Sequence, residues 1–98
     1  MGKIKILYTI NFVTNGGPSR VLLNQIYNLN KEEFDIYLLT IIDQNNESII
    51  RDLKKFGVKI TQLKIPKSLV GAILNKNLII NEVLKLNPDI VHTHGIVT

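Results

Sequence analysis

Short apolar runs rich in β-branched residues alternate along this chain with segments whose apolar residues recur every three or four positions. The first pattern is typical of strands and the second of amphipathic helices. Strands that alternate regularly with helices favour an α/β fold in which right-handed crossovers join parallel strands. The sequence therefore predicts a Rossmann-like three-layer sandwich, with a parallel sheet of about four strands and helices on both faces.

Four segments are predicted to be strands, and their patterns place two of them in the sheet. Phe34–Ile42 is apolar on both faces from Ile36 onward, as is typical of a central parallel strand covered by helices. Val58–Leu63 alternates apolar with polar residues, so we expect it at a sheet edge with one wet face. The other two predicted strands are Ile4–Ile10 and Asp89–His92.

Three amphipathic helices are predicted between these strands. The first lies within Pro18–Asn30, with the proline in its first turn and the asparagine at its end. The second follows the polar turn Asp43–Asn46, which supplies N-cap candidates, and ends at Gly57. The third is predicted over Leu69–Leu86, with an interruption around Asn75–Asn77.

The connections limit the order of the strands. Right-handed crossovers, with the first strand in the middle and the chain winding outward, give the order 3-2-1-4. The first and fourth strands are then neighbours, so the loop Asn11–Arg20 and the turn after the fourth strand share one edge. Ligands bind at the carboxyl edge of open α/β sheets where the winding reverses, so we expect a site between these two segments.

Composition bounds the class of protein. The 98 residues make one domain, and no apolar run approaches the roughly 20 residues that a membrane-spanning helix needs. The first residues lack the apolar core of a signal peptide, so a cytoplasmic location is predicted. The chain has no cysteine, which excludes disulfides, cysteine-ligated metals and cysteine nucleophiles.

The formal net charge of +4 comes mainly from lysines spread along the chain, which are typical of solvated surface. Such a balance favours anionic partners, namely nucleotide phosphates or the inner face of a membrane. Nucleic acid is not expected, because the aromatic residues do not interleave with basic ones as a stacking platform requires.

The pair Gly16-Gly17 stands just ahead of the first predicted helix. Glycine lets the backbone approach a ligand closely, and the N–H groups at a helix N-terminus suit a phosphate. A plain tight turn also explains such a pair. Judged from the two glycines alone, a plain turn is the more frequent explanation than phosphate binding. Arg20 is either a phosphate-closing guanidinium or a surface arginine, and Ser19 is either a helix cap or a ligand-binding hydroxyl.

His92 and His94 are the two histidines, and on an extended segment they point to the same side. A metal site needs a third or fourth ligand, which the chain does not offer in an obvious place, so no metal is predicted. A histidine at the carboxyl end of a strand suits a hydrogen bond to a sugar hydroxyl or to developing charge. For His92 we favour burial as a hydrogen-bonded residue at the end of the strand.

Four segments together resemble the opening of a known family: Ile4–Ile10, Asn15–Arg20, Asp35–Thr40 and Asn87–Gly95. In this order and spacing they resemble retaining glycosyltransferases with two Rossmann-like lobes, the GT-B architecture. This large family includes sucrose synthase-like enzymes and the sugar transferases of capsule and lipopolysaccharide synthesis. The resemblance spans the whole chain, and its strongest part is the run Pro88–Gly95.

The resemblance implies that residues 1–98 are a partial Rossmann-like domain, the first part of the acceptor-binding N-terminal lobe. The nucleotide-sugar is a substrate, so no cofactor is implied, and it is held mainly by a C-terminal lobe that this chain does not include. The Glu-x7-Glu signature of that lobe is not found here. The parent enzyme would transfer a sugar to a saccharide or glycolipid acceptor in cell-surface polysaccharide synthesis, with peripheral association at the inner face of the membrane.

The resemblance also implies roles for single residues. Gly16 and Gly17 would lie against the donor diphosphate when the lobes close, and His94 would approach the transferred sugar. The family often has an acidic residue just before the arginine of this loop, whereas Ser19 precedes Arg20 here. No residue of this chain is assigned as catalytic with certainty, and the isolated chain is expected to be inactive.

Two other functions remain open from the residues. One is a freestanding flavodoxin-like binding or interaction module, which predicts a sheet edge protected by charge or by a partner. The other is a fragment of a metal-dependent hydrolase that uses His92 and His94. A chain cut after the fourth strand has an unpaired outer edge on that strand, so we expect the isolated fragment to form a dimer or a larger assembly through it.

Overall fold

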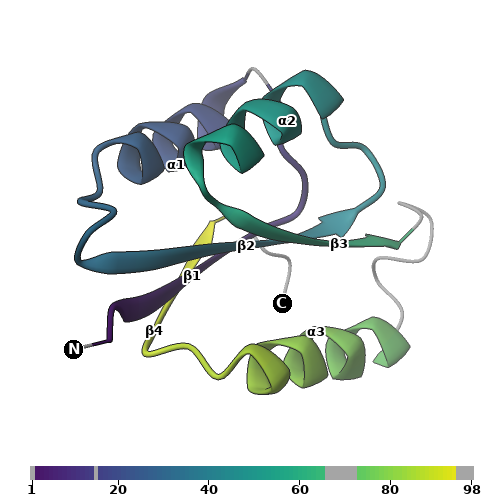
Figure 1. The fold of residues 1–98 in the computed structure, drawn as a ribbon. Coiled ribbons are helices and arrows are strands. Elements are labelled where there is room, and N and C mark those ends of the chain that lie inside the picture. The colour runs from purple at the N-terminus through teal and green to yellow at the C-terminus, as the bar shows by residue number, and fades with distance from the viewer. Residues whose placement is uncertain (1, 15, 66–72, 95–98) are drawn as a thin grey trace.

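The computed structural model describes residues 2–14, 16–65 and 73–94. Within these residues the chain forms a four-stranded parallel sheet in the order β3-β2-β1-β4 (Figure 1). The strands are β1 (Ile4–Ile10), β2 (Phe34–Ile42), β3 (Lys59–Ile65) and β4 (Ile90–His94). The helices are α1 (Gly17–Tyr27), α2 (Glu47–Phe56) and α3 (Ile73–Leu86).

The helices lie on both faces of the sheet, with α1 and α2 on one face and α3 on the other (Figure 1). This arrangement confirms the predicted α/β class, the three layers and the strand order. It also confirms that β2 is central and that β3 is an edge strand. No helix in the described part of the chain is long and apolar enough to cross a membrane.

The ends of α2 show why the helix forms where it does. The side chain of Asn46 accepts hydrogen bonds from the N–H groups of Ser48 and Ile49, at 3.0 and 3.2 Å. These bonds satisfy two of the donors that a helix N-terminus leaves without a helical partner. Gly57 ends the helix with φ of 105°, a left-handed conformation that side chains disfavour. Both predicted ends of α2 are therefore confirmed.

Two other predicted helix boundaries are wrong. α1 ends at Tyr27 with Asn28 as its C-cap, whereas we expected it to continue to Asn30. The Asn30 carbonyl instead accepts from the N–H groups of Glu33 and Phe34, both at 3.0 Å, and so forms the turn into β2. A carbonyl that closes this turn is not available to continue the helix.

α3 runs without interruption through Asn75–Asn77, contrary to the predicted break. An asparagine inside a helix costs less than about 0.7 kcal/mol relative to alanine, which packing readily offsets. The helix ends as expected, because Asn87 has φ of 49° and its N–H donates to the Val83 carbonyl at 3.1 Å. The predicted start at residues 69–72 lies outside the described residues.

The strand ends also shift by one or two residues. β3 is Lys59–Ile65, whereas Val58–Leu63 was predicted, and β4 is Ile90–His94, whereas Asp89–His92 was predicted. β4 extends further because its register with β1 continues until His94 lies beside Ile10. Pairing with a neighbour sets this end, and a single-strand pattern does not contain that information.

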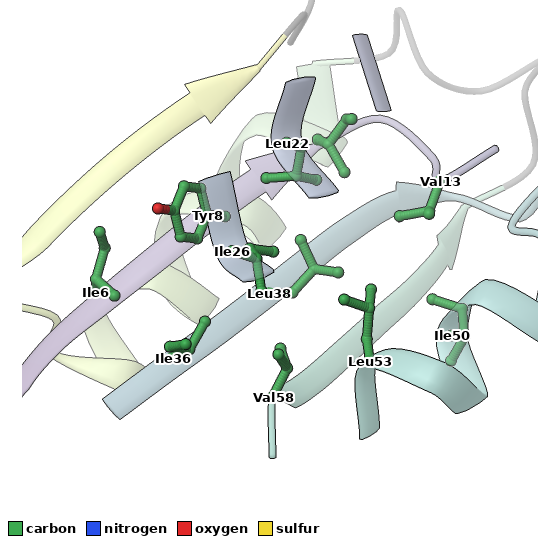
Figure 2. Packing of buried hydrophobic residues seen from close by; sticks show 11 residues of the cluster. Ile6, Tyr8, Val13, Leu22, Ile26, Ile36, Leu38, Ile50, Leu53 and Val58 are labelled. Atoms are coloured by element: carbon green, nitrogen blue, oxygen red, sulfur yellow. The ribbon is translucent and has the colours of Figure 1, made fainter. Parts of the chain in front are cut away.

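The main core lies between the sheet and the α1/α2 layer (Figure 2). Alternate residues of β1 and β2 point into it, as the two-residue period of a strand requires. Leu22, Ile26 and Leu53 cover them from the helices and are fully buried. The other members of this cluster are Ile6, Tyr8, Ile10, Val13, Ile36, Leu38, Ile50 and Val58. A smaller cluster, under α3, contains Ile41, Ile42 and Ile65 with Ile79 packed against them.

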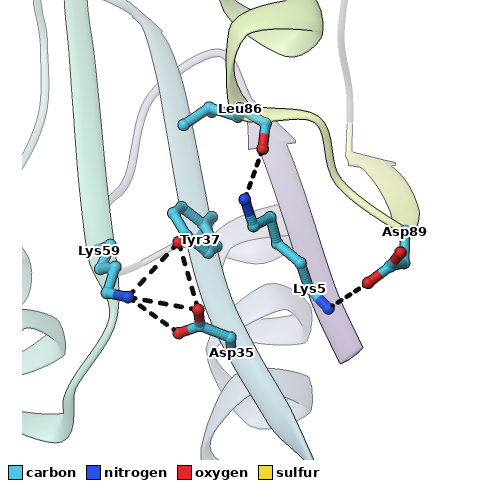
Figure 3. Close-up of polar contacts among 6 residues, drawn as sticks. All are labelled: Lys5, Asp35, Tyr37, Lys59, Leu86 and Asp89. Atoms are coloured by element: carbon cyan, nitrogen blue, oxygen red, sulfur yellow. Dashed lines mark hydrogen bonds and ion pairs between the residues drawn. The ribbon is translucent and has the colours of Figure 1, made fainter. Parts of the chain in front are cut away.

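Polar contacts fasten the start of β1 to the connection between α3 and β4 (Figure 3). The Lys5 N–H donates to the Asp89 carboxylate at 2.7 Å, and the Asp89 N–H donates to the Lys5 carbonyl at 2.8 Å. The Lys5 ammonium donates to the Leu86 carbonyl at 2.8 Å, at the C-terminus of α3 where a cation is favoured. These three bonds hold β4 in register beside β1.

The core packing gives a first prediction. Leu53→Ala should lower the free energy of unfolding by about 2 to 5 kcal/mol, because it removes a fully buried side chain and leaves a cavity. Lys54→Ala is the matched control, since its exposed side chain is adjacent on the same helix. Urea unfolding of both variants tests this, and equal midpoints would contradict the packing described.

Candidate functional site

The loop that carries the glycine pair and the end of β4 meet at the carboxyl edge of the sheet. The parallel register places His94 beside Ile10, the last residue of β1, from which the loop begins. The expected juxtaposition of the two segments is therefore present in the fold. The His94 side chain lies outside the described part of the structure, so its contact with a sugar stays a prediction.

The backbone of this loop is held against the end of β2 and the turn that follows it. The Asn11 carbonyl accepts from the N–H groups of Ile41 and Ile42, at 3.0 and 2.7 Å. The Val13 carbonyl accepts from the Asn46 N–H at 2.7 Å. Bonds from two different places on β2 and its turn leave the first half of the loop little freedom to move.

Asn45 connects this loop to two strands, β2 and β3. Its side-chain oxygen accepts from the Val13 N–H at 2.8 Å. Its side-chain N–H group donates to the Thr40 hydroxyl of β2 at 2.9 Å and to the Gln62 side chain of β3 at 3.1 Å. The polar turn Asp43–Asn46 was predicted as a source of helix caps, and this role of Asn45 was not predicted. An asparagine directly before the cap residue is the only signal in the sequence.

Ser19 braces the second half of the loop. It is buried, its hydroxyl accepts from the Thr14 N–H at 3.0 Å, and it lies 3.4 Å from the Phe12 carbonyl as a donor. The Thr14 hydroxyl in turn accepts from the Gly16 N–H at 3.2 Å. Ser19 is not the helix cap, because Gly16 occupies the N-cap position without a side-chain cap.

The two glycines are not required by the conformation of the loop. Gly16 has φ of −98° and ψ of 175°, an extended conformation open to any residue, and the φ of Gly17 is not left-handed. A Cβ on Gly16 would meet only the Thr14 hydroxyl, at 3.7 Å, and one on Gly17 would meet nothing within 4 Å. The plain-turn explanation therefore lacks its usual basis here, and the absent side chains leave open space in front of α1.

The N-terminus of α1 is electrostatically suited to an anion. The first helical hydrogen bond runs from the Arg20 N–H to the Gly16 carbonyl at 3.1 Å, so the donors before Arg20 have no helical acceptor. The first turn contains no acidic residue that would occupy the positive end of the helix dipole. Arg20 is exposed and forms no salt bridge within the described residues.

His92 is exposed on β4, so the expectation that it is buried is wrong. Its ring stacks on Tyr8 with the centroids 5.4 Å apart. Burial raises the pKa of the Tyr8 hydroxyl above its ordinary value of 10.0. The difference arises because β4 is an edge strand, which has a neighbour on one side only within the described residues. Among the described residues no three His, Asp or Glu side chains gather as a metal site would require.

Two further features lie away from the glycine loop. The Thr9 hydroxyl is buried near the same sheet edge, on the α3 face, and has no hydrogen-bond partner among the described residues. A shallow pocket of about 240 Å³ lies at the opposite, amino edge, beside Lys31 and Phe56. The Lys31 ammonium is already engaged there, because it donates to the Phe56 carbonyl at 2.8 Å and caps α2.

Comparison of the chain with protein-family models, curated proteins and solved structures found no match in any of the three. The functional assignment therefore depends on the geometry of the loop and on the sequence resemblance.

The role of Asn45 gives a second prediction. Asn45→Ala leaves the Val13 N–H without its acceptor, which should lower the free energy of unfolding by about 1 to 3 kcal/mol. Amide exchange at Val13 should become faster, and it can be followed by NMR. Gln44→Ala is the control, because this neighbouring side chain is exposed. Unchanged exchange at Val13 would show that Asn45 does not hold the loop.

Proposed function

We propose that this chain is the first part of the N-terminal lobe of a GT-B glycosyltransferase. The parent enzyme transfers a sugar from a nucleotide-sugar donor to a saccharide or glycolipid acceptor, in cell-surface polysaccharide synthesis. The proposal has two supports, which share the residues of the glycine loop: the family resemblance of four ordered sequence segments, and the position of an anion-suited loop at the carboxyl edge of the sheet.

The observation that carries the proposal is the glycine pair at the positive end of α1. Neither its φ angles nor its packing within the protein requires glycine. A ligand that approaches the backbone closely does require it, because a side chain would occupy the same space. A diphosphate fits this requirement, since it is small, doubly charged and bound well by helix N-terminal N–H groups.

The proposal gives each predicted residue a role. The backbone at Gly16 and Gly17 takes the donor diphosphate, and the Arg20 guanidinium pairs with its charge. Ser19 shapes the loop from within, and His94 contacts the transferred sugar. The nucleotide-sugar is a substrate, and a second lobe supplies most of its contacts.

The same proposal places the enzyme in the cytoplasm at the inner face of the membrane. The net charge of +4 supports peripheral attraction to anionic lipid, which weakens as salt rises. A glycolipid acceptor would be reached from that surface.

The decisive experiment compares Gly17→Ala with the unchanged chain in an NMR titration with inorganic pyrophosphate. The amide signals of Gly16, Gly17 and Ser19 should shift in the unchanged chain. Gly17→Ala should weaken binding by about tenfold, or 1.4 kcal/mol. Its free energy of unfolding should stay equal or rise by up to about 1 kcal/mol, because the new methyl group meets no atom of the protein.

Two controls separate the site from general effects. Gly2→Ala adds a methyl group that also meets nothing, far along the chain from the loop, and should leave binding unchanged. Arg20→Ala should weaken pyrophosphate binding, whereas Arg51→Ala, an exposed arginine of α2, should not. Equal affinity of Gly17→Ala and the unchanged chain would contradict the proposed diphosphate site.

A further prediction concerns activity. The purified 98-residue chain should show no sugar transfer from nucleotide-sugars to saccharide or glycolipid acceptors, because the lobe that holds the donor is not part of it. Radiolabelled donors provide the measurement. Robust turnover by the chain alone would contradict the two-lobe assignment.

The interaction-module alternative requires a protected sheet edge. β4 carries no Lys, Arg, Asp, Glu or Pro within Ile90–His94, so charge does not protect its edge. A module of this kind would need a partner at β4. No geometric observation within the described residues favours the metal-dependent hydrolase.

A further inference from the structure

Most of the exposed large hydrophobic side chains lie on β4 or on the helices beside it. Two are on β4 itself, two are on α3 and one is on α1. Their exposed fractions are 44% for Ile90, 45% for Val91, 54% for Ile80, 70% for Leu84 and 52% for Val21. Such a concentration of apolar surface on one side of a small domain marks an interaction surface.

The register and the helix period place these side chains on both faces of β4. Ile90 lies beside Ile6, whose side chain enters the α1/α2 core, and Val91 lies beside Leu7 on the α3 face. Tyr27 packs on Phe56 of α2, with ring centroids 4.8 Å apart, so one flank of α1 faces α2. Val21 lies six residues before Tyr27, a rotation of about 240° beyond one full turn of the helix. Val21 therefore projects from the other flank of α1, away from α2 and toward β4.

The exposed residues of α3 form a similar flank. Ile80 and Leu84 are four residues apart and therefore lie one above the other. Ile79 packs against the smaller cluster of Ile41, Ile42 and Ile65. Ile80 and Leu84 lie on another side of α3 and face away from that cluster. The Leu86 carbonyl accepts from the Lys5 ammonium, which places the C-terminus of α3 against β1, the strand that pairs with β4 (Figure 3).

The two edges of the sheet differ in their protection. On β3, Lys59 forms a salt bridge with Asp35 at 3.2 Å, and its hydrogen bonds to Asp35 and Tyr37 raise its pKa (Figure 3). β3 also has a register shift opposite residues 40–42, and its Lys64 has φ of 54°. Lysines and irregular backbone are devices that prevent edge pairing, and β4 has neither.

β4 also presents backbone groups on its outer side. The Asp89 N–H points to the Lys5 carbonyl of β1, so the backbone groups of the next residue, Ile90, point away from β1. No strand of the described residues pairs with that side.

We propose that the β4 edge is an interface between two copies of this chain. The two β4 strands run antiparallel about a two-fold axis, with Val91 opposite Val91 of the second copy, and the two sheets become one continuous sheet of eight strands. This inference does not use the proposed glycosyltransferase function. It conflicts with that function where the rest of a longer lobe adds a strand beside β4, as in the strand order 3-2-1-4-5-6.

A second copy fits this surface because the surface is complementary to itself. With the axis perpendicular to the sheet, α1 meets α1 of the other copy on one face and α3 meets α3 on the other. In this register Ile90 lies opposite His92 of the other copy on the α1 face, from which Val21 projects. Val91 meets Val91 on the α3 face, on the side of the helix that carries Leu84. A two-fold contact of this kind closes after two copies, so it does not extend into a fibre.

The charges favour the antiparallel arrangement. Asp89 lies at the amino end of β4, whereas the positive end of α1 and the exposed Arg20 lie at the carboxyl edge. Antiparallel strands direct Asp89 of each copy toward the carboxyl edge of the other. Parallel strands would place the two Asp89 carboxylates side by side. The lysines of β3 stay at the two far edges.

Sedimentation equilibrium of the 98-residue chain tests the interface. The unchanged chain should form a species of twice its 11.1 kDa mass. Val91→Lys places two like charges directly opposite each other at the axis and should weaken association by roughly tenfold or more. Thr61→Lys is the matched control, since residue 61 is on the α3 face of the other edge strand, and it should still dimerise.

A second variant and a second measurement cover loss of folding in Val91→Lys. Leu84→Glu changes an exposed helix residue, leaves the core intact and should also yield monomer. Amide exchange at Ile90 should be slow in the dimer and fast in both variants. Circular dichroism establishes that each variant is folded.

Three results would overturn the proposal. One is a monomer at all concentrations, and another is a series of assemblies that grows beyond the dimer. The third is a longer polypeptide containing this chain that is monomeric with a protected Ile90 amide, because another part of the same polypeptide would then cover β4.

Discussion

The pairing of β1 with both β2 and β4 is the constraint on which the rest of the structure depends. Because β1 lies between β2 and β4 in the sheet, the loop that leaves β1 lies between the end of β2 and the end of β4. The Lys5 N–H donates to the Asp89 carboxylate, and the Asp89 N–H donates to the Lys5 carbonyl. These two bonds hold β4 in this register. The same pairing places β4 at the edge of the sheet, with apolar side chains exposed on both of its faces.

The glycine loop is rigid because its polar groups are satisfied within the protein. Asn45 and Asn46 bind the first half of the loop, and Ser19 and Thr14 bind the second half. A loop held in this way does not need to be ordered when a ligand arrives, so less of the binding free energy is lost. At the N-terminus of α1 the N–H groups of Gly17 and Ser19 have no helical acceptor, which is why the proposed diphosphate is placed there.

Much of the fold could be predicted from the sequence because local patterns and general rules agree. Short apolar runs predicted the strands, and apolar residues that recur every three or four positions predicted the helices. The rule of right-handed crossovers predicted the strand order 3-2-1-4. Boundaries were less accurate where a tertiary bond decided them. Asn30 closes a turn into β2 instead of a helix, and β4 extends to His94 because β1 continues beside it.

Sequence patterns alone were enough to predict the α/β class, the strand order and the position of the glycine loop at the carboxyl edge. These features follow from side-chain periodicity and chain chirality, which are properties of short segments. Three features could be seen only in the folded protein: Ser19 is buried, Asn45 joins the glycine loop to β2 and β3, and His92 is exposed. Each of these depends on contacts between residues far apart in the chain, and no local pattern encodes such contacts.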